Sequence, residues 1–290
     1  MTTWWCPFVS EGALICQLNT SLIFSAVEPL LDPLQFAYRV GRGVEVAKLF
    51  LLDKLHKHLE LPQSHARILF ADFSSAFNTM QPHILAQKLI SNFSLQHDLA
   101  LWIVDSLTNR CQQVFVNMSS EQAVTCTGFP HGYVLSAPFY ILYTDDRRSK
   151  QENSYLIKFA DDSALLSLLQ GTQDGHCATV NQFMDGCDDS YLDLNVDKTK
   201  EMMVDFRRQG CAHVAIQIHG EPVEIVNSYK CLGTIVEDTL EWDLNTEAIT
   251  KKGHQRLHLL RKLRSFSVEP AIVKVFYHSF IESLLTFSFI

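Results

Sequence analysis

Three aspartates follow apolar segments of this 290-residue chain, and their positions indicate metal-dependent phosphoryl transfer. Asp72 ends the apolar run 67–71, which predicts a buried strand. Asp161 and Asp162 stand at the turn of a predicted strand hairpin over residues 155–168. Adjacent carboxylates at the end of an apolar strand are costly unless a cation neutralises them, and Mg²⁺ prefers such oxygen ligands. We therefore expect the three aspartates to bind two Mg²⁺ ions about 3.5 to 4 Å apart, with Mn²⁺ as an alternative.

A lone aspartate at a strand end is usually a turn residue or a helix cap, so the prediction depends on elements that bring both clusters together. The composition, 47% hydrophobic and 11% aromatic, allows a sizeable core in one or two domains. The hydrophobic pattern predicts an α+β fold in which helices pack against a sheet. The expected helices cover 44–60, 82–93, 95–108, a stretch ending near 143, 177–192, 244–265 and 270–287. The expected strands cover 67–72, 111–117, 123–128, the hairpin 155–168, 200–206, 213–219 and 229–236.

Six short segments occur along the chain in a fixed order. They are 32–39, the segment around Asp72 with Ala76 and Phe77, Pro130 and Gly132, Phe-Ala-Asp-Asp at 159–162, Leu-Asn-x-x-Lys-Thr at 194–199 and Tyr-Lys-x-Leu-Gly at 229–233. With these segments, the chain from about residue 30 to the C-terminus resembles the reverse transcriptase domain of vertebrate non-LTR (LINE-type) retrotransposons. In that order they resemble its fingers motif, first palm motif, Pro-Gln-Gly motif, catalytic turn, Leu-Asn-x-x-Lys-Thr motif and primer-grip hairpin. Any one motif is weak evidence, but six in order are strong.

The resemblance implies a right-hand polymerase fold with a palm sheet packed by helices. Residues 1–66 would form partial fingers with an unmatched N-terminus, 67–237 the palm with finger elements, and 238–290 truncated thumb-like helices. The implied activity is RNA-directed DNA synthesis by two-metal nucleotidyl transfer, with an RNA template, a DNA primer and deoxynucleoside triphosphates as partners. Nucleotidyl cyclases also place acids on a similar sheet, but the Leu-Asn-x-x-Lys-Thr and primer-grip motifs favour an enzyme that copies a template.

The resemblance also assigns roles to individual side chains. Asp72, Asp161 and Asp162 are the expected catalytic metal ligands. Lys198 is the expected catalytic proton donor to pyrophosphate, or else one of many exposed lysines. Phe77 stands where the family has an aromatic that blocks a ribose 2′-hydroxyl, and its alternative is ordinary core. The expected nucleotide-binding residues are Phe73, Phe77, His131, Gly132 and Arg39.

Basic residues cluster in one predicted helix, although the net charge of −8 argues against a surface that binds polyanions throughout. The segment 251–264 has six basic residues and no acid, with leucines at the spacing of an inward stripe. It is expected to bind duplex backbone as part of the thumb, or to be a solvated cationic face. Arg39 and Arg42 are expected to pair with template or triphosphate oxygens, or to be surface charges. The expected nucleic-acid-binding residues are Arg42, Lys251, Lys252, Arg256, Arg261 and Lys262.

A second acid pair, Asp145 and Asp146 in a Tyr-x-Asp-Asp sequence, matches the retroviral catalytic signature better than the Phe-Ala-Asp-Asp turn does. The residues before the pair have helical length, and Arg147 and Arg148 follow where a returning strand would need apolar residues. We therefore expect Asp145 and Asp146 to end a helix in a solvated loop.

The chain departs from the family pattern at several places. His131 replaces the Gln of the Pro-Gln-Gly motif, Tyr133 replaces a small residue or Cys, and residues 1–29 do not resemble the fingers segment. The chain ends at Ile290, inside what resembles the thumb, and nothing in it is similar to an endonuclease. These departures leave a second hypothesis, a fragment or decayed copy that is catalytically impaired and at most binds nucleic acid. Primer extension on RNA would distinguish it from an active enzyme.

Cysteine usage and hydropathy predict an intracellular protein. The eight cysteines form no CxxC pair, which indicates reduced thiols and predicts no zinc site. Residues 1–29 lack a basic start, and Glu11 and Glu28 interrupt their apolar patches, so neither a signal peptide nor a membrane span is expected. We expect a location in the nucleus or the cytoplasm.

Overall fold

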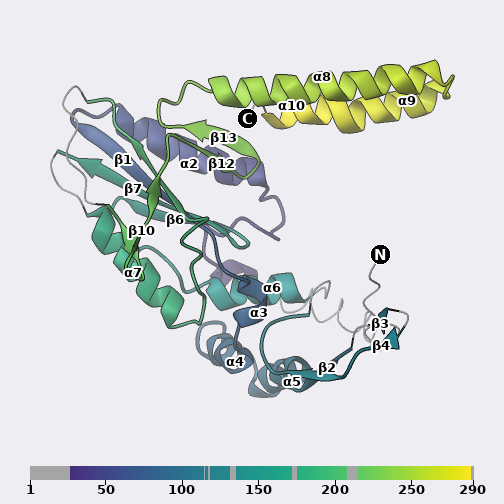
Figure 1. The fold of residues 1–290 in the computed structure, drawn as a ribbon. Helices are drawn as coiled ribbons and strands as arrows, with labels where there is room; N and C mark the ends of the chain where they lie inside the picture. The colour runs from purple at the N-terminus through teal and green to yellow at the C-terminus, as the bar shows by residue number, and fades with distance from the viewer. Residues whose placement is uncertain are drawn as a thin grey trace.

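The computed structural model describes residues 27–113, 115–116, 118–130, 135–171, 175–207 and 215–288 (Figure 1). Its main sheet has five strands in the order β11-β8-β1-β7-β6. The middle strand β1 (Ser64–Ala71) pairs antiparallel with β7 (Asp162–Gln170) and with β8 (Lys200–Val204). β6 (Ser154–Phe159) pairs antiparallel with β7, and β11 (Glu224–Ile225) pairs parallel with β8. Every residue of β1 is buried, as expected for a strand covered on both faces.

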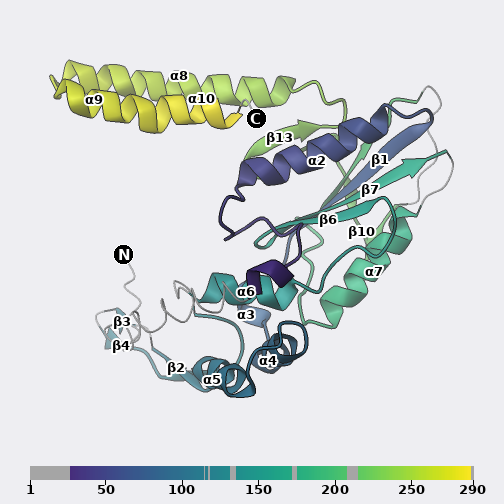
Figure 2. The same cartoon turned by 180° about the vertical axis from the view of Figure 1, so that it is seen from behind.

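Successive side chains of β1 point to opposite faces of the sheet, and each face has its own hydrophobic core. Ile68 belongs to the core that includes residues of helix α2 (Val44–Leu59). Its neighbour Leu69 belongs to the other core, which includes residues of helix α7 (His176–Asp188). Figures 1 and 2 show α2 and α7 on opposite sides of the sheet. One short apolar run therefore holds both layers of the fold together.

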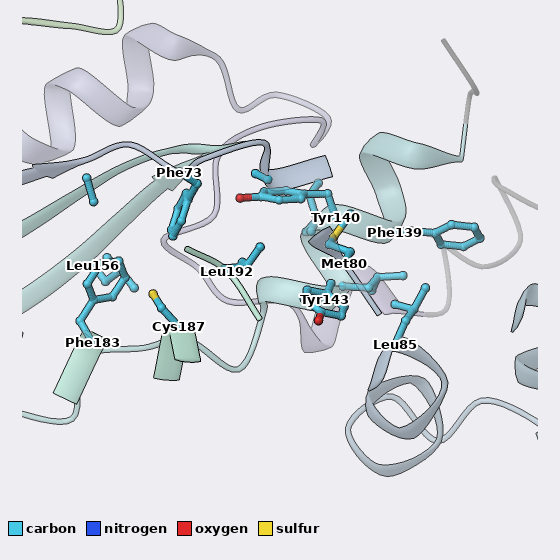
Figure 3. Close-up of a cluster of buried hydrophobic side chains, with 14 of the residues drawn as sticks. Phe73, Met80, Leu85, Phe139, Tyr140, Tyr143, Leu156, Phe183, Cys187 and Leu192 are labelled. Carbon is cyan, nitrogen blue, oxygen red and sulfur yellow. The ribbon is translucent and has the colours of Figure 1, made fainter. Parts of the chain in front are cut away.

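A group of helices extends the α7 side of the core. Helix α6 (Ser136–Thr144) is almost entirely buried, as expected for a helix that is apolar all round. It packs against α4 (Pro82–Ser91), and Tyr140 and Tyr143 of α6 share the core with Leu85 of α4 (Figure 3). The other helices of this part are α3 (Ala76–Thr79) and α5 (His97–Leu107).

Several short elements complete this part of the chain. A short 3₁₀ helix, η1, covers Glu28–Leu30. The small two-stranded sheets are β2 (Arg110–Gln112) with β5 (Ala123–Thr125), β3 (Phe115–Val116) with β4 (Met118–Ser119), and β9 (Gln217–Ile218) with β10 (Glu221–Pro222).

The C-terminal part forms a hairpin of strands followed by a helical arm. β12 (Ser228–Cys231) and β13 (Thr234–Glu237) form the hairpin. We call residues 243–288 the helical arm. Figures 1 and 2 show its first helix running antiparallel to the helices that follow it. The arm consists of α8 (Asp243–Ser265), α9 (Pro270–Phe276), the π-helix η2 (Tyr277–Glu282) and α10 (Ser283–Ser288).

The expected α+β fold is confirmed, and most expected helices and strands are present to within a few residues. The segment 229–236, expected as strand with a primer-grip hairpin at 229–233, forms two short paired strands, and Leu232 and Gly233 take positive φ values of 48° and 86° where the chain reverses. The strand expected at 123–128 ends at Thr125. Parts of the strands expected at 111–117 and 213–219 lie outside the described residues. In the described ranges, no helix has the length and hydrophobicity needed to span a membrane.

Candidate active site

The Phe-Ala-Asp-Asp segment forms the tight turn between β6 and β7. Phe159 pairs with Asp162, so only Ala160 and Asp161 connect the two strands. Ala160 has a φ of 56°, a conformation that costs a non-glycine residue about 1 to 2 kcal/mol. Such strain persists where the surrounding structure fixes the backbone, and here the two paired strands do so. The turn leaves Asp161 and Asp162 exposed at the end of the sheet.

The register of the sheet brings Asp72 to the same place. Ala71 on β1 pairs with Ser163 on β7. The next residue along β1 is Asp72 and the preceding residue on β7 is Asp162, so the two occupy neighbouring positions on adjacent strands. The three predicted metal ligands therefore come from segments about ninety residues apart in sequence but meet at one end of the sheet.

The Leu-Asn-x-x-Lys-Thr motif holds the backbone of Asp72 on both sides. The Asn195 amide donates to the Asp72 carbonyl at 2.9 Å, and the Asp72 amide donates to Thr199 Oγ1 at 3.3 Å. The Thr199 amide donates to the Asn195 carbonyl at 2.8 Å, which closes the loop, and Thr199 is fully buried. The sequence-based predictions assign no individual role to Asn195 or Thr199. The signal that could have identified Thr199 is its position, as a small polar residue directly after Lys198 in a motif expected to be catalytic.

The three carboxylates influence one another electrostatically. The pKa of Asp162 is raised, first by desolvation at the sheet end and then by the negative charges of Asp161 and Asp72. The pKa of the Tyr229 phenol is raised mainly by desolvation, with smaller contributions from Cys231, Asp162 and Asp72. This end of the sheet therefore carries like charges whose repulsion a bound cation would relieve.

Lys198 places one cation beside these acids. Its Nζ lies 3.5 Å from Asp72 Oδ1, and 64% of its side chain is exposed, so the ion pair is weak. Among the residues that the structure describes, no group of three or more His, Cys, Asp or Glu side chains is arranged to hold a metal ion. The donor set nonetheless suits Mg²⁺, since it consists of carboxylates that already repel one another. Metal binding requires these carboxylates to turn toward a common ion.

The β12–β13 hairpin lies beside the acids. The ring of Tyr229 stacks on Phe70 of β1, with 4.1 Å between the ring centroids. A cavity of about 40 Å³ is lined by Asp162, Tyr229 and Lys48, among others. Lys48 comes from α2 and its Nζ donates to Thr234 Oγ1 at 3.0 Å. The segment that resembles a primer grip is thus attached both to β1 and to α2 next to the predicted metal ligands.

Phe77 lies between the core and the predicted nucleotide motif. Its ring stacks on Tyr140 with 4.8 Å between centroids, and the side chain is half-buried. Its carbonyl accepts a hydrogen bond from the Phe129 amide at 2.8 Å. Gly128 has a φ of 70°, and a Cβ at this position would lie 2.7 Å from the Phe77 carbonyl oxygen. Only glycine allows this close approach, which brings the residues directly before Pro130 onto Phe77.

Among the other expected nucleotide-binding residues, Phe73 lies within the described part of the chain, whereas His131 and Gly132 do not. Phe73 is buried, with its ring 6.4 Å from that of Phe183 in the core (Figure 3), so a contact with nucleotide stays a prediction. His131, Gly132 and Tyr133 lie outside the described residues.

Arg39 and Arg42 donate hydrogen bonds to backbone carbonyls of their own segment. Arg39 Nη1 donates to the Asp32 carbonyl at 2.9 Å, and its Nη2 donates to the Glu28 carbonyl at 3.3 Å. Desolvation and the nearby charge of Arg42 lower the pKa of Arg39, although its acidic neighbours oppose the shift. Arg42 donates to the Pro33 carbonyl. Both arginines stabilise the loop before α2, and their contact with template or nucleotide stays a prediction.

The second acid pair has a structural role. The prediction that Asp145 and Asp146 end a helix is confirmed, since α6 ends directly before them. The expected solvated loop is wrong for Asp145, whose side chain is 6% exposed. It accepts a hydrogen bond from the Asp32 amide at 2.6 Å and pairs with Arg148 at 2.9 Å. Asp146 is 43% exposed and pairs with Lys88 at 2.8 Å. The local pattern could not reveal the burial of Asp145, because the Asp32 amide that it accepts from comes from a distant segment.

The basic segment 251–264 lies on α8, the first helix of the arm. Arg256 is half-buried and donates to the Phe280 carbonyl, which links α8 to η2. The leucines of the expected inward stripe are half-buried. The exposed basic residues are Lys251, Lys252, Arg261, Lys262 and Arg264.

A sheet that carries acids at one end, with a hairpin beside them and helices on both faces, is the palm of a right-hand polymerase. The chain belongs to the reverse transcriptase (RNA-dependent DNA polymerase) family, whose sequence model matches residues 13–239. A second sequence model, that of the N-terminal part of alkylated DNA repair protein alkB homolog 8, matches residues 242–283 in the helical arm. No curated protein matches the chain.

Solved telomerase structures share the fold. Apo telomerase from Candida tropicalis is 13% identical with a TM-score of 0.53, over 79% of this chain and 40% of that one. A form truncated from the C-terminal domain is 11% identical with a TM-score of 0.52, over 81% and 45%. The complex with a TWJ fragment of telomeric RNA is 12% identical with a TM-score of 0.51, over 97% and 47%. At these identities the likeness shows the fold alone, and the chain spans less than half the length of these structures.

Proposed function

We propose that this chain is the RNA-directed DNA polymerase domain of a vertebrate LINE-type retrotransposon. Its substrates would be an RNA template, a DNA primer and deoxynucleoside triphosphates. The observation that carries the proposal is the meeting of Asp72, Asp161 and Asp162 at one end of the palm sheet in a chain of the reverse transcriptase family. The six ordered motifs support the LINE-type origin. In this proposal residues 1–66 contribute to the fingers, 67–237 form the palm and 238–290 form thumb-like helices.

Primer extension replaces one bond to phosphorus with another. The primer 3′-oxygen attacks the α-phosphorus of the nucleotide, loses its proton, and displaces pyrophosphate. Asp72, Asp161 and Asp162 would hold two divalent ions, which would activate the 3′-hydroxyl and stabilise the charge on the leaving pyrophosphate. Lys198 Nζ would give a proton to the pyrophosphate oxygen, and its exposure beside Asp72 supports this role.

The remaining roles concern substrate contact. Arg39, Phe73, His131 and Gly132 would contact the nucleotide, with Phe77 against its sugar. Arg42 and the basic residues of α8 would contact nucleic-acid phosphates. The cations that remain exposed on α8 support this role, because five of them share one helix without an intervening acid. The five are Lys251, Lys252, Arg261, Lys262 and Arg264.

Extension of a DNA primer annealed to RNA tests the proposed function directly. With Mg²⁺ and deoxynucleoside triphosphates, the purified chain should extend the primer to the end of the template. The alternative, an impaired relic, is favoured by His131 in place of the family's Gln and predicts binding of the primer–template without extension. Binding measured by fluorescence anisotropy on the same substrate separates the two. Binding without extension would contradict the polymerase proposal.

Mg²⁺ should raise the melting temperature of the parent protein and raise it less in Asp162→Asn. Because the folded-state pKa of Asp162 is raised, ionisation of this carboxyl destabilises the folded protein. The stability of the protein therefore falls as the pH rises through the folded pKa. A bound cation removes that cost in the parent, whereas the neutral amide has no such cost to remove. Thermal unfolding in EDTA and in excess Mg²⁺ at neutral pH measures the difference. An equal Mg²⁺ effect in both proteins would place the ion elsewhere.

Phe77→Val should increase the incorporation of ribonucleotides relative to deoxyribonucleotides by at least about tenfold, the gain expected when roughly 1.4 kcal/mol of steric discrimination is lost. The smaller side chain leaves room for a 2′-hydroxyl next to the residues preceding Pro130. The change also removes the stack on Tyr140, so the variant is expected to melt at a lower temperature. Competition between the two nucleotide types measures the preference. An unchanged ratio in a folded variant would mean that Phe77 is only a core residue.

A further inference from the structure

The C-terminal end of α6 is bound by two lysines that the proposed chemistry does not use. Lys88 of α4 donates to the Tyr143 carbonyl at 2.6 Å. Lys158 of β6 donates to the Thr144 carbonyl at 3.0 Å and to the Arg147 carbonyl at 2.7 Å. The last carbonyls of a helix lack partners within the helix and carry partial negative charge, so buried ammonium groups stabilise this end.

Lys158 differs from Lys88 because it also holds the segment before α2. Its Nζ lies 2.8 Å from Asp32 Oδ2, and both side chains are almost fully buried. Its backbone pairs with the same segment, since the Phe36 amide donates to the Lys158 carbonyl and the Lys158 amide donates to the Leu34 carbonyl, each at 2.9 Å. The segment 32–36 thus lies along β6, with a single residue of β6 between Lys158 and the Ala160–Asp161 turn.

The same lysine is connected to the predicted nucleotide motif through α6. At the N-terminal end of this helix, Ser136 Oγ donates to the Pro130 carbonyl at 2.8 Å. The nine-residue helix α6 therefore links Pro130 to the carbonyls that Lys158 binds. One ammonium group contacts both the segment before α2 and the end of α6, and it belongs to the strand that leads to Asp161.

Loss of the Lys158 ammonium would release the segment 32–39 from its position, rather than only weaken its contacts there. Desolvation lowers the pKa of Lys158, and the negative charge of Asp32 opposes that shift, while the helix carbonyls accept hydrogen bonds from its ammonium group. Without Lys158, the Asp32 carboxylate is left buried near the Asp145 carboxylate, which accepts from the Asp32 amide. Asp145 keeps its pairing with Arg148, whereas the buried Asp32 carboxylate loses its cation and favours water, so the segment 32–39 is expected to move outward.

We propose that Lys158 is a positioning residue that fixes the segment 32–39 and α6 relative to the Asp161–Asp162 turn, and thereby sets the affinity for the incoming nucleotide. This inference rests on the proposed polymerase function. Lys158 touches neither substrate nor metal in it. It acts by keeping Arg39, Pro130 and the Asp161–Asp162 turn in one fixed arrangement.

Lys158→Met, Asp32→Asn and the double variant test the proposal, with Lys88→Met as the matched control. Lys88→Met also removes a buried ammonium from the end of α6 but does not touch the segment 32–36 or β6. Lys158→Met and Asp32→Asn should each raise the KM for deoxynucleotide by about tenfold, with a smaller change in kcat, as expected when binding groups shift by a fraction of an ångström. The double variant should have about the same KM as either single variant, since each single substitution already removes the Lys158–Asp32 ion pair.

Hydrogen exchange provides a readout that needs no catalysis. The backbone amides of Phe36 and of residue 158 should exchange at least about tenfold faster in Lys158→Met than in the parent. In Lys88→Met their exchange rates should equal those of the parent. Unaltered protection together with an unaltered KM in a folded Lys158→Met would overturn the proposal, as would equal effects of Lys88→Met. If the parent extends no primer, the polymerase proposal fails, and the exchange result alone decides whether Lys158 positions the segment.

Discussion

Asp161→Asn should abolish primer extension while leaving the fold intact. The amide keeps the shape of the side chain but removes one of the charges that would bind the divalent ions. Several kcal/mol of charge stabilisation in the transition state depend on such ligands, which corresponds to a rate loss of about a thousandfold or more. Asp161 is exposed in the two-residue turn and supports no neighbouring contact among the described residues, so the melting temperature in EDTA should not fall. Single-turnover extension and thermal unfolding measure the two effects.

Asp146→Asn provides the control for this experiment, because Asp146 belongs to the other acid pair of the chain. It follows the end of α6 and pairs with Lys88 of α4, outside the Phe-Ala-Asp-Asp turn. Asp146→Asn should therefore lower the melting temperature slightly and retain extension. The reverse outcome, with Asp146→Asn inactive and Asp161→Asn active, would move the catalytic acids to the Tyr-x-Asp-Asp sequence. Unfolding of Asp161→Asn would show instead that its carboxylate is structural.

The elements that position the site follow from local patterns. The apolar run before Asp72 and the hairpin around Asp161 were predictable because strand patterns and a tight turn depend on neighbouring residues. The pairing that brings the two together was implied only by the family resemblance. No local rule specifies that Ala71 pairs with Ser163, since strand partners are chosen by the whole fold.

The buried charges around the site could not be predicted in the same way. Asp145 was expected in solvent, yet its partner Asp32 lies 113 residues earlier. The hydrogen bonds from the Arg39 guanidinium to carbonyls of its own loop were likewise not expected, and its contact with a nucleotide stays a prediction. A charged residue whose partner is unknown is predicted to be exposed, because charged side chains are rarely buried unless they are paired. The polar contacts that tie the segments together are therefore the part that only the structure supplies.

Glu201→Gln should destabilise the protein by about 3 to 5 kcal/mol, the usual cost of removing one partner of a buried ion pair. Arg67 Nε lies 2.6 Å from Glu201 Oε1, and both side chains are fully buried between β1 and β8. His176 of α7 adds to the network, with its Nε2 3.8 Å from Glu201 Oε1 and its Nδ1 2.7 Å from Ser167 Oγ. The amide leaves the Arg67 charge in the core without its carboxylate. Urea unfolding followed by circular dichroism measures the loss, which corresponds to a fall in melting temperature of roughly 10 °C.

The double variant Arg67→Met with Glu201→Leu separates the cost of an unpaired charge from the value of the pair. Buried ion pairs replaced by apolar side chains of similar volume are often as stable as the original, since no charge then has to be desolvated. The double variant should therefore recover most of the stability that Glu201→Gln loses. If it is as unstable as the single variant, the pair itself stabilises the sheet through the contacts of His176 and Ser167. If Glu201→Gln is as stable as the parent, the Arg67 charge has another route to neutralisation. In either folded variant, Asp72 still directly follows the strand that carries Arg67, so retained extension would show that the pair supports the sheet and not the chemistry.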